Sequence, residues 1–132
     1  MRQKFTAAVS SLKEIRKFVQ DKLTENNINS KVIQDVILGV GEASMNIVKH
    51  GYKGGNEKDH IEVLVKIDEK QIEINFFDNG IPVVPQNIKP RDLGDVKPGG
   101  LGSYFMSETM DEVKWETKSK DWINHLILVK YL

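Results

Sequence analysis

Glu42, Asn46 and His50 recur at intervals of four residues, immediately before Gly51. Residues four apart lie on the same side of a helix, so these three form one slowly turning polar stripe. In such a stripe a carboxylate can act as a general base, and an amide oxygen is a hard ligand suited to Mg²⁺ held against phosphates. The polar face of any surface helix looks the same, so the stripe alone leaves both interpretations open.

A second group of residues, Asp78-Asn79-Gly80, follows the bulky pair Phe76-Phe77. Asn-Gly is a strong turn signal, so an ordinary turn is one interpretation. The other is a carboxylate at the floor of an apolar cleft, where it can accept a hydrogen bond from an exocyclic amine such as that of adenine. The motif by itself favours neither interpretation.

The third group is the sequence GGLG, made up of Gly99, Gly100, Leu101 and Gly102. Successive backbone N–H groups at the start of a helix form an anion site, and glycine lets a phosphate approach the main chain closely. A flexible loop end with an ordinary helix cap is the alternative interpretation. The sequence therefore presents a candidate base, a candidate amine acceptor and a candidate anion site, and each motif by itself also has an ordinary structural interpretation.

Two helices are expected to position these groups. Apolar residues recur every three or four positions over residues 7–25 and again over 31–50, which predicts two amphipathic helices. Ser30 is expected to cap the second helix, whose buried stripe comprises Ile33, Val36, Ile37, Val40, Ile47 and Val48. Glu42 lies nearly opposite that stripe on a helical wheel.

Strands are expected in the rest of the chain. Clean alternation predicts a hairpin of residues 61–67 and 71–78, and a second hairpin lies within 112–118 and 123–132. The opening residues 1–7 are expected to form a short edge strand.

Residues 81–100 hold all four prolines and lack periodicity, which is typical of a functional loop. A short helix is expected to follow over 101–111. The order predicts one domain, residues 1–132, with a two-layer α/β sandwich: a mixed, mostly antiparallel sheet with its helices on one face.

Composition excludes several classes of protein. The chain of 132 residues has 19 basic and 19 acidic residues, so it lacks the charge excess of a protein that binds nucleic acid directly. It contains no cysteine, which excludes disulfides, thiolate metal sites and a cysteine nucleophile. The N-terminus lacks the apolar run of a signal peptide, and no stretch is long enough to cross a membrane. A cytoplasmic protein is expected.

The order of the three groups resembles the GHKL superfamily, the histidine-kinase-like ATPases that include histidine kinases and DNA gyrase. The resemblance extends from about residue 30 to the C-terminus. Within that superfamily, the segments GEASMNIVKHGYKG, FFDNGIPVVP and GGLGSYFMSETMDEVKWE are most similar to the anti-sigma factor serine kinases. Pro82 also matches this narrower family, because the wider superfamily often has glycine there.

This resemblance implies a role for each site residue. Glu42 would be the catalytic base, and Asn46 would hold Mg²⁺ across the phosphates of ATP. Asp78 would recognise the adenine amine, and Gly80 would let the backbone pass close to the base. The main-chain amides of the GGLG segment, at the far edge of a lid over about 87–100, would meet the phosphates, with His50 near the phosphate end.

One departure from the family concerns the last strand. Many members have Gly-Thr there, with the threonine beside adenine, whereas this chain has Ile123-Asn124-His125. Either Asn124 or His125 is available to replace that threonine.

The function implied is an ATP- and Mg²⁺-dependent protein serine kinase that binds a sigma factor and phosphorylates an anti-anti-sigma antagonist. The resemblance also favours a homodimer. Two alternatives remain: a nucleotide-binding switch that acts through partner binding without phosphoryl transfer, and a structural interaction domain with no nucleotide site.

Overall fold

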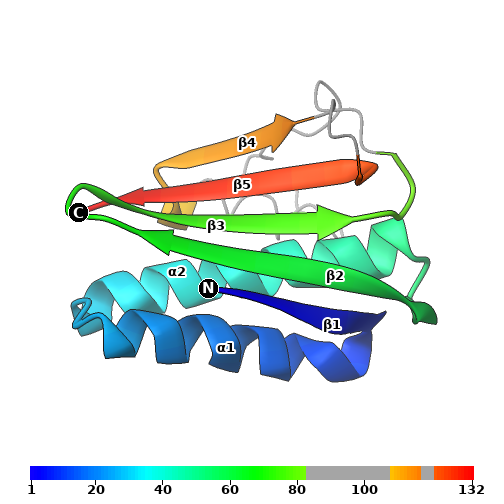
Figure 1. Ribbon diagram of the computed structural model, residues 1–132, viewed down its shortest axis with the longest axis horizontal. Helices are drawn as coiled ribbons and strands as arrows, with labels where there is room; N and C mark the ends of the chain where they lie inside the picture. The colour runs from blue at the N-terminus through cyan, green and yellow to red at the C-terminus, as the bar shows by residue number, and fades with distance from the viewer. Residues whose placement is uncertain (83–107, 117–120) are drawn as a thin grey trace, which may run out of the picture.

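The computed structural model describes residues 1–82, 108–116 and 121–132. Its strands form one five-stranded sheet in the order β1-β2-β3-β5-β4. Every neighbouring pair is antiparallel. Figure 1 shows the two long helices together on one face of this sheet, so the predicted two-layer α/β sandwich is confirmed. The strands are β1 (Arg2–Ala8), β2 (Gly55–Ile67), β3 (Gln71–Asp78), β4 (Glu112–Glu116) and β5 (Asn124–Tyr131).

The helical layer begins with a short 3-10 turn, η1 (Val9–Ser11), that leads into α1 (Leu12–Glu25). The second long helix, α2 (Ser30–Asn46), continues into a π-helical turn, η2 (Ile47–Gly51). The prediction that Ser30 caps α2 is wrong: the Asn29 side chain accepts the capping hydrogen bond from Lys31 N at 2.8 Å. A longer side chain one residue earlier thus satisfies the exposed N–H group of the first turn.

The first hairpin was predicted correctly at β3 but not at β2. The strand β2 begins at Gly55 rather than at Ile61, because its polar first half pairs with β1. A register shift between Thr6 and Ala7 accommodates this pairing and is typical of a β-bulge. The turn between β2 and β3 is fixed by Asp68, whose Oδ1 accepts from Lys70 N at 2.7 Å and from Gln71 N at 2.9 Å.

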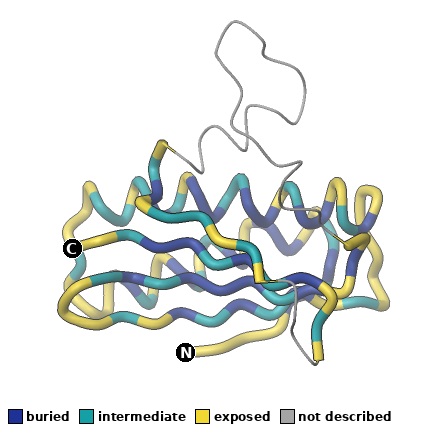
Figure 2. The backbone as a smooth tube through the Cα atoms, turned by 90° about the horizontal axis from the view of Figure 1, so that it is seen from above, coloured by how far each residue is buried: buried dark blue, intermediate teal, exposed yellow. Residues whose placement is uncertain are grey.

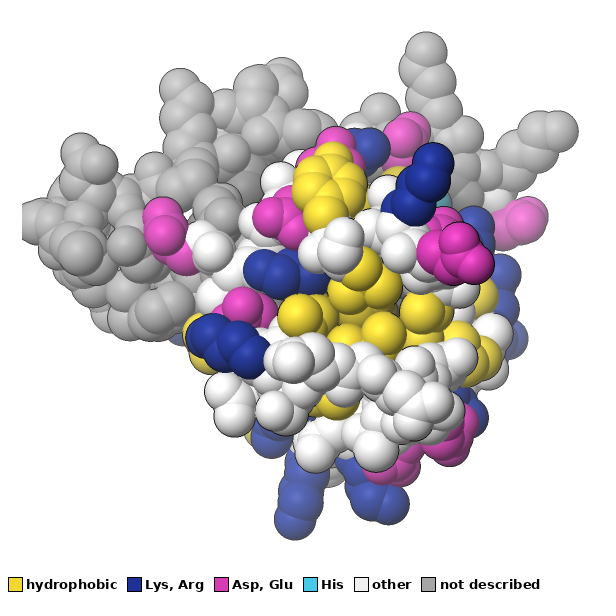
Figure 3. Space-filling view, turned by 90° about the vertical axis from the view of Figure 1, so that its left-hand side faces the viewer, with side chains coloured by type: hydrophobic (Ala, Val, Ile, Leu, Met, Phe, Trp, Pro, Cys, Tyr) yellow, Lys and Arg dark blue, Asp and Glu magenta, His cyan; other side chains and the backbone are white. Residues whose placement is uncertain are grey.

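The core lies between the sheet and the helices. The buried positions follow the inner faces of the strands and one stripe of each helix (Figure 2). Ile33 and Ile37 of α2 were predicted to be buried but are only partly covered. At the end of the molecule that carries the α1–α2 and β2–β3 turns, apolar side chains gather at the surface, with charged side chains above them and on either side (Figure 3).

The C-terminal part of the chain and the length of the helices can also be compared with the predictions. The predicted helix over 101–111 lies mostly outside the described residues, whereas the pairing of β4 with β5 confirms the second hairpin. No helix within the described residues is both long enough and apolar enough to span a bilayer.

Candidate functional site

Asp78 ends strand β3 and is almost completely buried, with 2% of its surface exposed. Its Oδ1 accepts two hydrogen bonds, from Gly80 N at 3.0 Å and from Asn124 Nδ2 at 2.9 Å. Burial raises the pKa of this carboxyl above its usual value, and the two hydrogen bonds oppose that rise. The aspartate is therefore a fixed hydrogen-bond acceptor inside the fold rather than a residue of an exposed turn.

Asn124, and not His125, is the residue of the last strand that contacts Asp78. Register places Asn124 directly opposite Asp78, and its amide also donates to Ile81 O at 3.0 Å. Successive side chains of a strand point to opposite faces, so His125 lies on the outer face of the sheet. There it stacks on Phe77 with ring centroids 4.2 Å apart. Of the two residues available to replace the family threonine, Asn124 is therefore the one that contacts Asp78.

The end of the α2–η2 helix packs directly against the turn that follows Asp78. Ile81 N donates to Gly51 O at 2.8 Å, and the two backbones touch at Gly51 and Gly80. A Cβ added at Gly80 would lie 2.6 Å from Gly51 O and 2.8 Å from its carbonyl carbon. Because these are main-chain atoms, they cannot move aside as a flexible side chain can. Because position 80 is glycine, the end of the helix that carries Glu42, Asn46 and His50 can pack against the turn that follows Asp78.

We therefore expect Gly80→Ala to destabilise the fold by about 1–3 kcal/mol, the usual cost of overpacking. Thermal denaturation of the variant without nucleotide measures this loss. Gly41→Ala is the matched control, because a Cβ at position 41 would meet only the flexible Cδ of Arg16, at 3.4 Å. The control should be neutral or up to about 1 kcal/mol more stable, since alanine favours a helix. Equal melting temperatures for the two variants would contradict the contact between Gly51 and Gly80.

The polar stripe runs along α2 and η2 away from this contact. Glu42 and Asn46 are partly exposed, and His50 is exposed within the π-helical turn, a distortion that is frequent at functional sites. At 1.5 Å per residue, Glu42 lies roughly 13 Å along the helix from Gly51. A ligand that touches both Asp78 and Glu42 must therefore be elongated, as a nucleoside triphosphate is.

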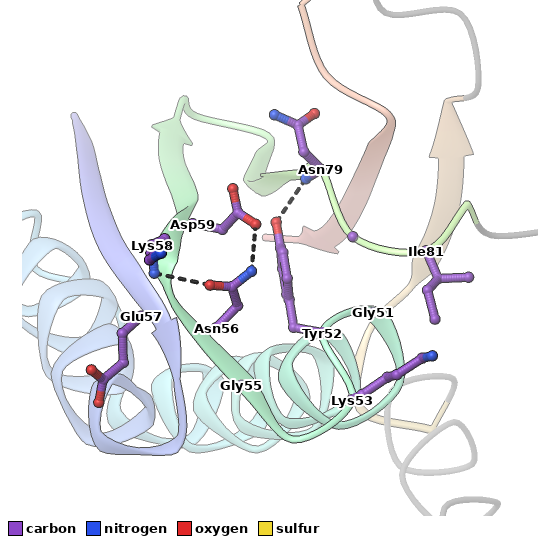
Figure 4. Close-up of a pocket in the computed structure, with 11 residues that line it drawn as sticks. Gly51, Tyr52, Lys53, Gly55, Asn56, Glu57, Lys58, Asp59, Asn79 and Ile81 are labelled. Atoms are coloured by element: carbon purple, nitrogen blue, oxygen red, sulfur yellow. Dashed lines mark hydrogen bonds between the residues drawn. The ribbon is translucent and has the colours of Figure 1, made fainter.

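A pocket of about 630 Å³ adjoins the same turn and is lined by the ends of η2 and β3 and the start of β2. Figure 4 shows Tyr52 at its centre, with its hydroxyl accepting from Asn79 N at 2.8 Å. Burial raises the pKa of Tyr52 to about 12, so the hydroxyl stays neutral at physiological pH. The side chains of Glu42, Asn46 and His50 do not line this pocket. Through its hydrogen bond with Asn79 N, Tyr52 links the end of η2 to the turn that follows β3.

The remaining predicted residues cannot be placed. Gly99, Gly100, Leu101 and Gly102, together with the predicted lid over 87–100, lie outside the described residues. Within the described part of the chain, no group of three or more acidic or histidine side chains converges on one point. Mg²⁺ usually takes most of its ligands from substrate phosphates and water, so a single amide oxygen at Asn46 is compatible with a magnesium site.

Two residues that hold the site together, Gly51 and Tyr52, were not predicted. The only signal for Gly51 was its place after His50, which indicated a helix end and nothing more. Nothing in the sequence indicated that Tyr52 would reach a residue 27 positions away. Both roles depend on tertiary contacts between α2 and β3.

Comparison with known proteins identifies the family of the chain. The model of the histidine kinase-like ATPase domain matches residues 5–130. The chain is 35% identical to serine-protein kinase RsbW of Bacillus licheniformis over 107 residues, 70% of this chain and 66% of that protein. It is 36% identical to serine-protein kinase RsbW of Listeria monocytogenes over 92 residues, 64% of this chain and 58% of that protein. The chain thus spans about 58–66% of the length of these relatives.

Two solved structures share the fold at low sequence identity. The structure of the RsbU and RsbW domains of a Mycobacterium tuberculosis protein superposes with a TM-score of 0.64 at 14% identity, covering 99% of this chain and 32% of that one. The SiaB–SiaC complex of Pseudomonas aeruginosa gives a TM-score of 0.65 at 17% identity, covering 100% of this chain and 89% of that one. On the match over residues 5–130, the chain belongs to the histidine kinase-like ATPase domain family.

Proposed function

We propose that this chain is an ATP- and Mg²⁺-dependent protein serine kinase that also acts as an anti-sigma factor. It would bind a sigma factor and phosphorylate an anti-anti-sigma antagonist on serine, as a homodimer. The observation that carries this proposal is the buried, doubly hydrogen-bonded Asp78 packed against the end of the Glu42–Asn46–His50 helix. Membership of an ATPase family supports ATP as the ligand, and the serine-protein kinases among the relatives support the reaction.

The geometry of Asp78 fits an adenine base. Among the described residues, both hydrogen bonds to this carboxylate fall on Oδ1, which leaves Oδ2 to accept from an exocyclic amine. Asn124 directs its two N–H donors at Asp78 and Ile81, so it holds the carboxylate in place. We infer that Asn124, which stands where many family members have threonine, positions Asp78 for the adenine base.

The rest of the helix stripe fits the other end of the nucleotide. ATP with Mg²⁺ supplies the phosphoryl group and the charge neutralisation that phosphoryl transfer requires. Asn46 would hold the metal through its amide oxygen. Glu42 would accept the proton of the serine hydroxyl as that oxygen bonds to the γ-phosphorus and the bond to the β-phosphate oxygen breaks. His50 would lie beside the nucleotide, near its phosphate end.

Protein partners are also part of the proposal. The relatives are named serine-protein kinases, a name that implies a protein substrate. One structural neighbour was solved as a complex of two proteins. The antagonist would be the phosphoryl acceptor, and the sigma factor would be the protein that is held until the antagonist competes for it.

The test is phosphate transfer from radiolabelled ATP. The purified chain is incubated with Mg²⁺, γ-labelled ATP and each anti-anti-sigma protein encoded in the same genome, and the label is located by mass spectrometry. The proposal predicts label on a serine of one such protein. An antagonist that binds the chain but stays unlabelled would instead establish a nucleotide-dependent switch, and the absence of both binding and label would overturn the proposal.

A further inference from the structure

Asn79 joins two segments that border the turn after Asp78. Its main-chain N donates to the Tyr52 hydroxyl at 2.8 Å, and its side-chain Oδ1 accepts from Ile123 N at 2.9 Å. Figure 4 shows Tyr52 on one side of the Asn79 main chain and the Asn79 side chain on the other. This exposed residue therefore connects the residue after η2 with the residue before β5.

The Asn79 side chain extends the contact between β3 and β5 by one position. Strand β3 ends at Asp78, and its partner there is Asn124, the first residue of β5. Ile123 lies one residue beyond this last pair, and its N–H group bonds to the side chain of Asn79. Strand ends are where a sheet opens most easily. The bond to Ile123 therefore holds the end of β5 that carries Asn124.

The conformation of the turn does not account for an asparagine at position 79. An Asn-Gly pair suits a type I′ turn because both central residues of that turn have positive φ. Among the described residues, positive φ is found at Asn27, Lys53, Gly54 and Gly55 alone. Neither Asn79 nor Gly80 adopts that conformation, and the close approach of Gly51 already explains Gly80. What asparagine supplies at position 79 is its side-chain oxygen.

The end of β5 that Asn79 holds brings Asn124 to the candidate adenine site. Asn124 Nδ2 lies 2.9 Å from Asp78 Oδ1, and both side chains are buried, with 4% and 2% of their surfaces exposed. A bond lost in such a place is costly because water cannot readily replace it. A displaced β5 end would thus release the Asp78 carboxylate from the orientation that the fold gives it.

We propose that Asn79 is a positioning residue of the adenine site, which holds Asn124 against Asp78 through its bond to Ile123. It acts through these residues rather than by contact with the nucleotide. The inference rests on the proposed function and deepens it, because it names a residue outside the adenine contact that sets the affinity for ATP. Its effect should be confined to the base end of the nucleotide.

The variant Asn79→Ala tests the inference, because it removes the acceptor of Ile123 N and keeps the main-chain bond to Tyr52. Asn79→Asp is the rescue variant, since its carboxylate keeps an oxygen at the Oδ1 position. Asn26→Ala is the matched control, because Asn26 is also exposed and its Nδ2 donates to Lys22 O at 2.7 Å beyond the end of α1. Affinity for Mg-ATP is measured by titration calorimetry below the melting temperature of each variant.

We expect Asn79→Ala to weaken Mg-ATP binding about five- to tenfold, the usual equivalent of one hydrogen bond. Asn79→Asp should recover most of the wild-type affinity, and Asn26→Ala should leave the affinity unchanged. At saturating Mg-ATP, Asn79→Ala should transfer phosphate at the wild-type rate, because Glu42 lies at the far end of the nucleotide. A loss of folded protein would instead lower kcat and leave KM for ATP unchanged.

A double-mutant cycle shows whether Asn79 acts through Asp78. In the Asp78→Asn background, where the adenine contact is already lost, Asn79→Ala should change the affinity for Mg-ATP by less than about twofold. If Asn79→Ala does not fold, Tyr52→Phe replaces it throughout, because it releases the same turn at the Asn79 main chain.

Three outcomes would overturn the inference. If the wild-type chain binds Mg-ATP and Asn79→Ala binds it equally well, Asn79 has no positioning role and the proposed kinase stands. An equal loss of affinity with and without Asp78→Asn would show that Asn79 acts independently of Asp78. If the wild-type chain binds no Mg-ATP, the proposed function fails and this inference fails with it.

Discussion

Replacing Glu42 with alanine should slow phosphate transfer to the substrate serine about a hundredfold or more, because a general base contributes about 10²–10⁴-fold to a rate. The binding of Mg-ATP should be unchanged or slightly tighter, since the change removes a negative charge near the phosphates. Single-turnover transfer of labelled phosphate measures the rate, and calorimetric titration measures the affinity. The sigma factor should still bind.

Asn46→Ala is the informative comparison for the Glu42 variant. It would remove a metal ligand rather than a base, so both ATP affinity and turnover should fall. A Glu42→Ala protein that transfers phosphate at the normal rate would return Glu42 to the alternative interpretation, a partly solvated residue of a polar helix face. Melting temperatures of both variants must accompany the rates, because an unfolded protein also fails to transfer phosphate.

Asp78→Asn should weaken ATP binding by about 30- to 150-fold, the equivalent of about 2–3 kcal/mol for a charged hydrogen bond lost in a buried site. The asparagine can still accept from Gly80 N and Asn124 through its oxygen, which places its NH₂ group where Oδ2 stood. That group faces the adenine amine donor to donor. Titration calorimetry with Mg-ATP measures the loss.

The melting temperature of the nucleotide-free Asp78→Asn variant provides an internal control, because it should rise while the affinity for ATP falls. The pKa of Asp78 is raised in the folded protein, so the folded state holds this proton more tightly than the unfolded chain does. Ionised Asp78 therefore destabilises the fold above its folded-state pKa, and this destabilisation disappears as the pH falls through that pKa. We expect nucleotide-free Asp78→Asn to melt higher than the wild type near neutral pH, with a gain that shrinks in acid. Near-normal ATP affinity would show that Asp78 merely shapes a turn.

The sequence predicted the elements wherever a periodic pattern was strong. The alternation of residues 71–78 placed β3 correctly, and the four-residue spacing placed Glu42 and Asn46 on one helix. The start of β2 was missed because Gly55, Asn56 and the charged residues after them have low strand propensity. Only their pairing with Ala7 and Ala8 across the bulge makes them a strand.

The candidate site was predictable in its parts and not in its assembly. Motif spacing identified Asp78 and Gly80, but the partner of Asp78 depends on the register between β3 and β5. A shift of one residue would have turned His125 inward in place of Asn124. The contact of Gly51 with Gly80 likewise joins segments 29 positions apart that share no pattern. Such long-range contacts follow from the packing of helix on sheet, which a local pattern does not encode.

ATP is expected to bind with its base against Asp78, and the preference for ATP over GTP tests this most directly. Adenine presents an amine where guanine presents a carbonyl oxygen. A carboxylate acceptor pairs with the first and repels the second. Titration of the wild-type chain with Mg-ATP and Mg-GTP should give one ATP site per chain and a preference for ATP of about a hundredfold or more. Equal affinity for the two nucleotides, or no binding of ATP, would contradict it.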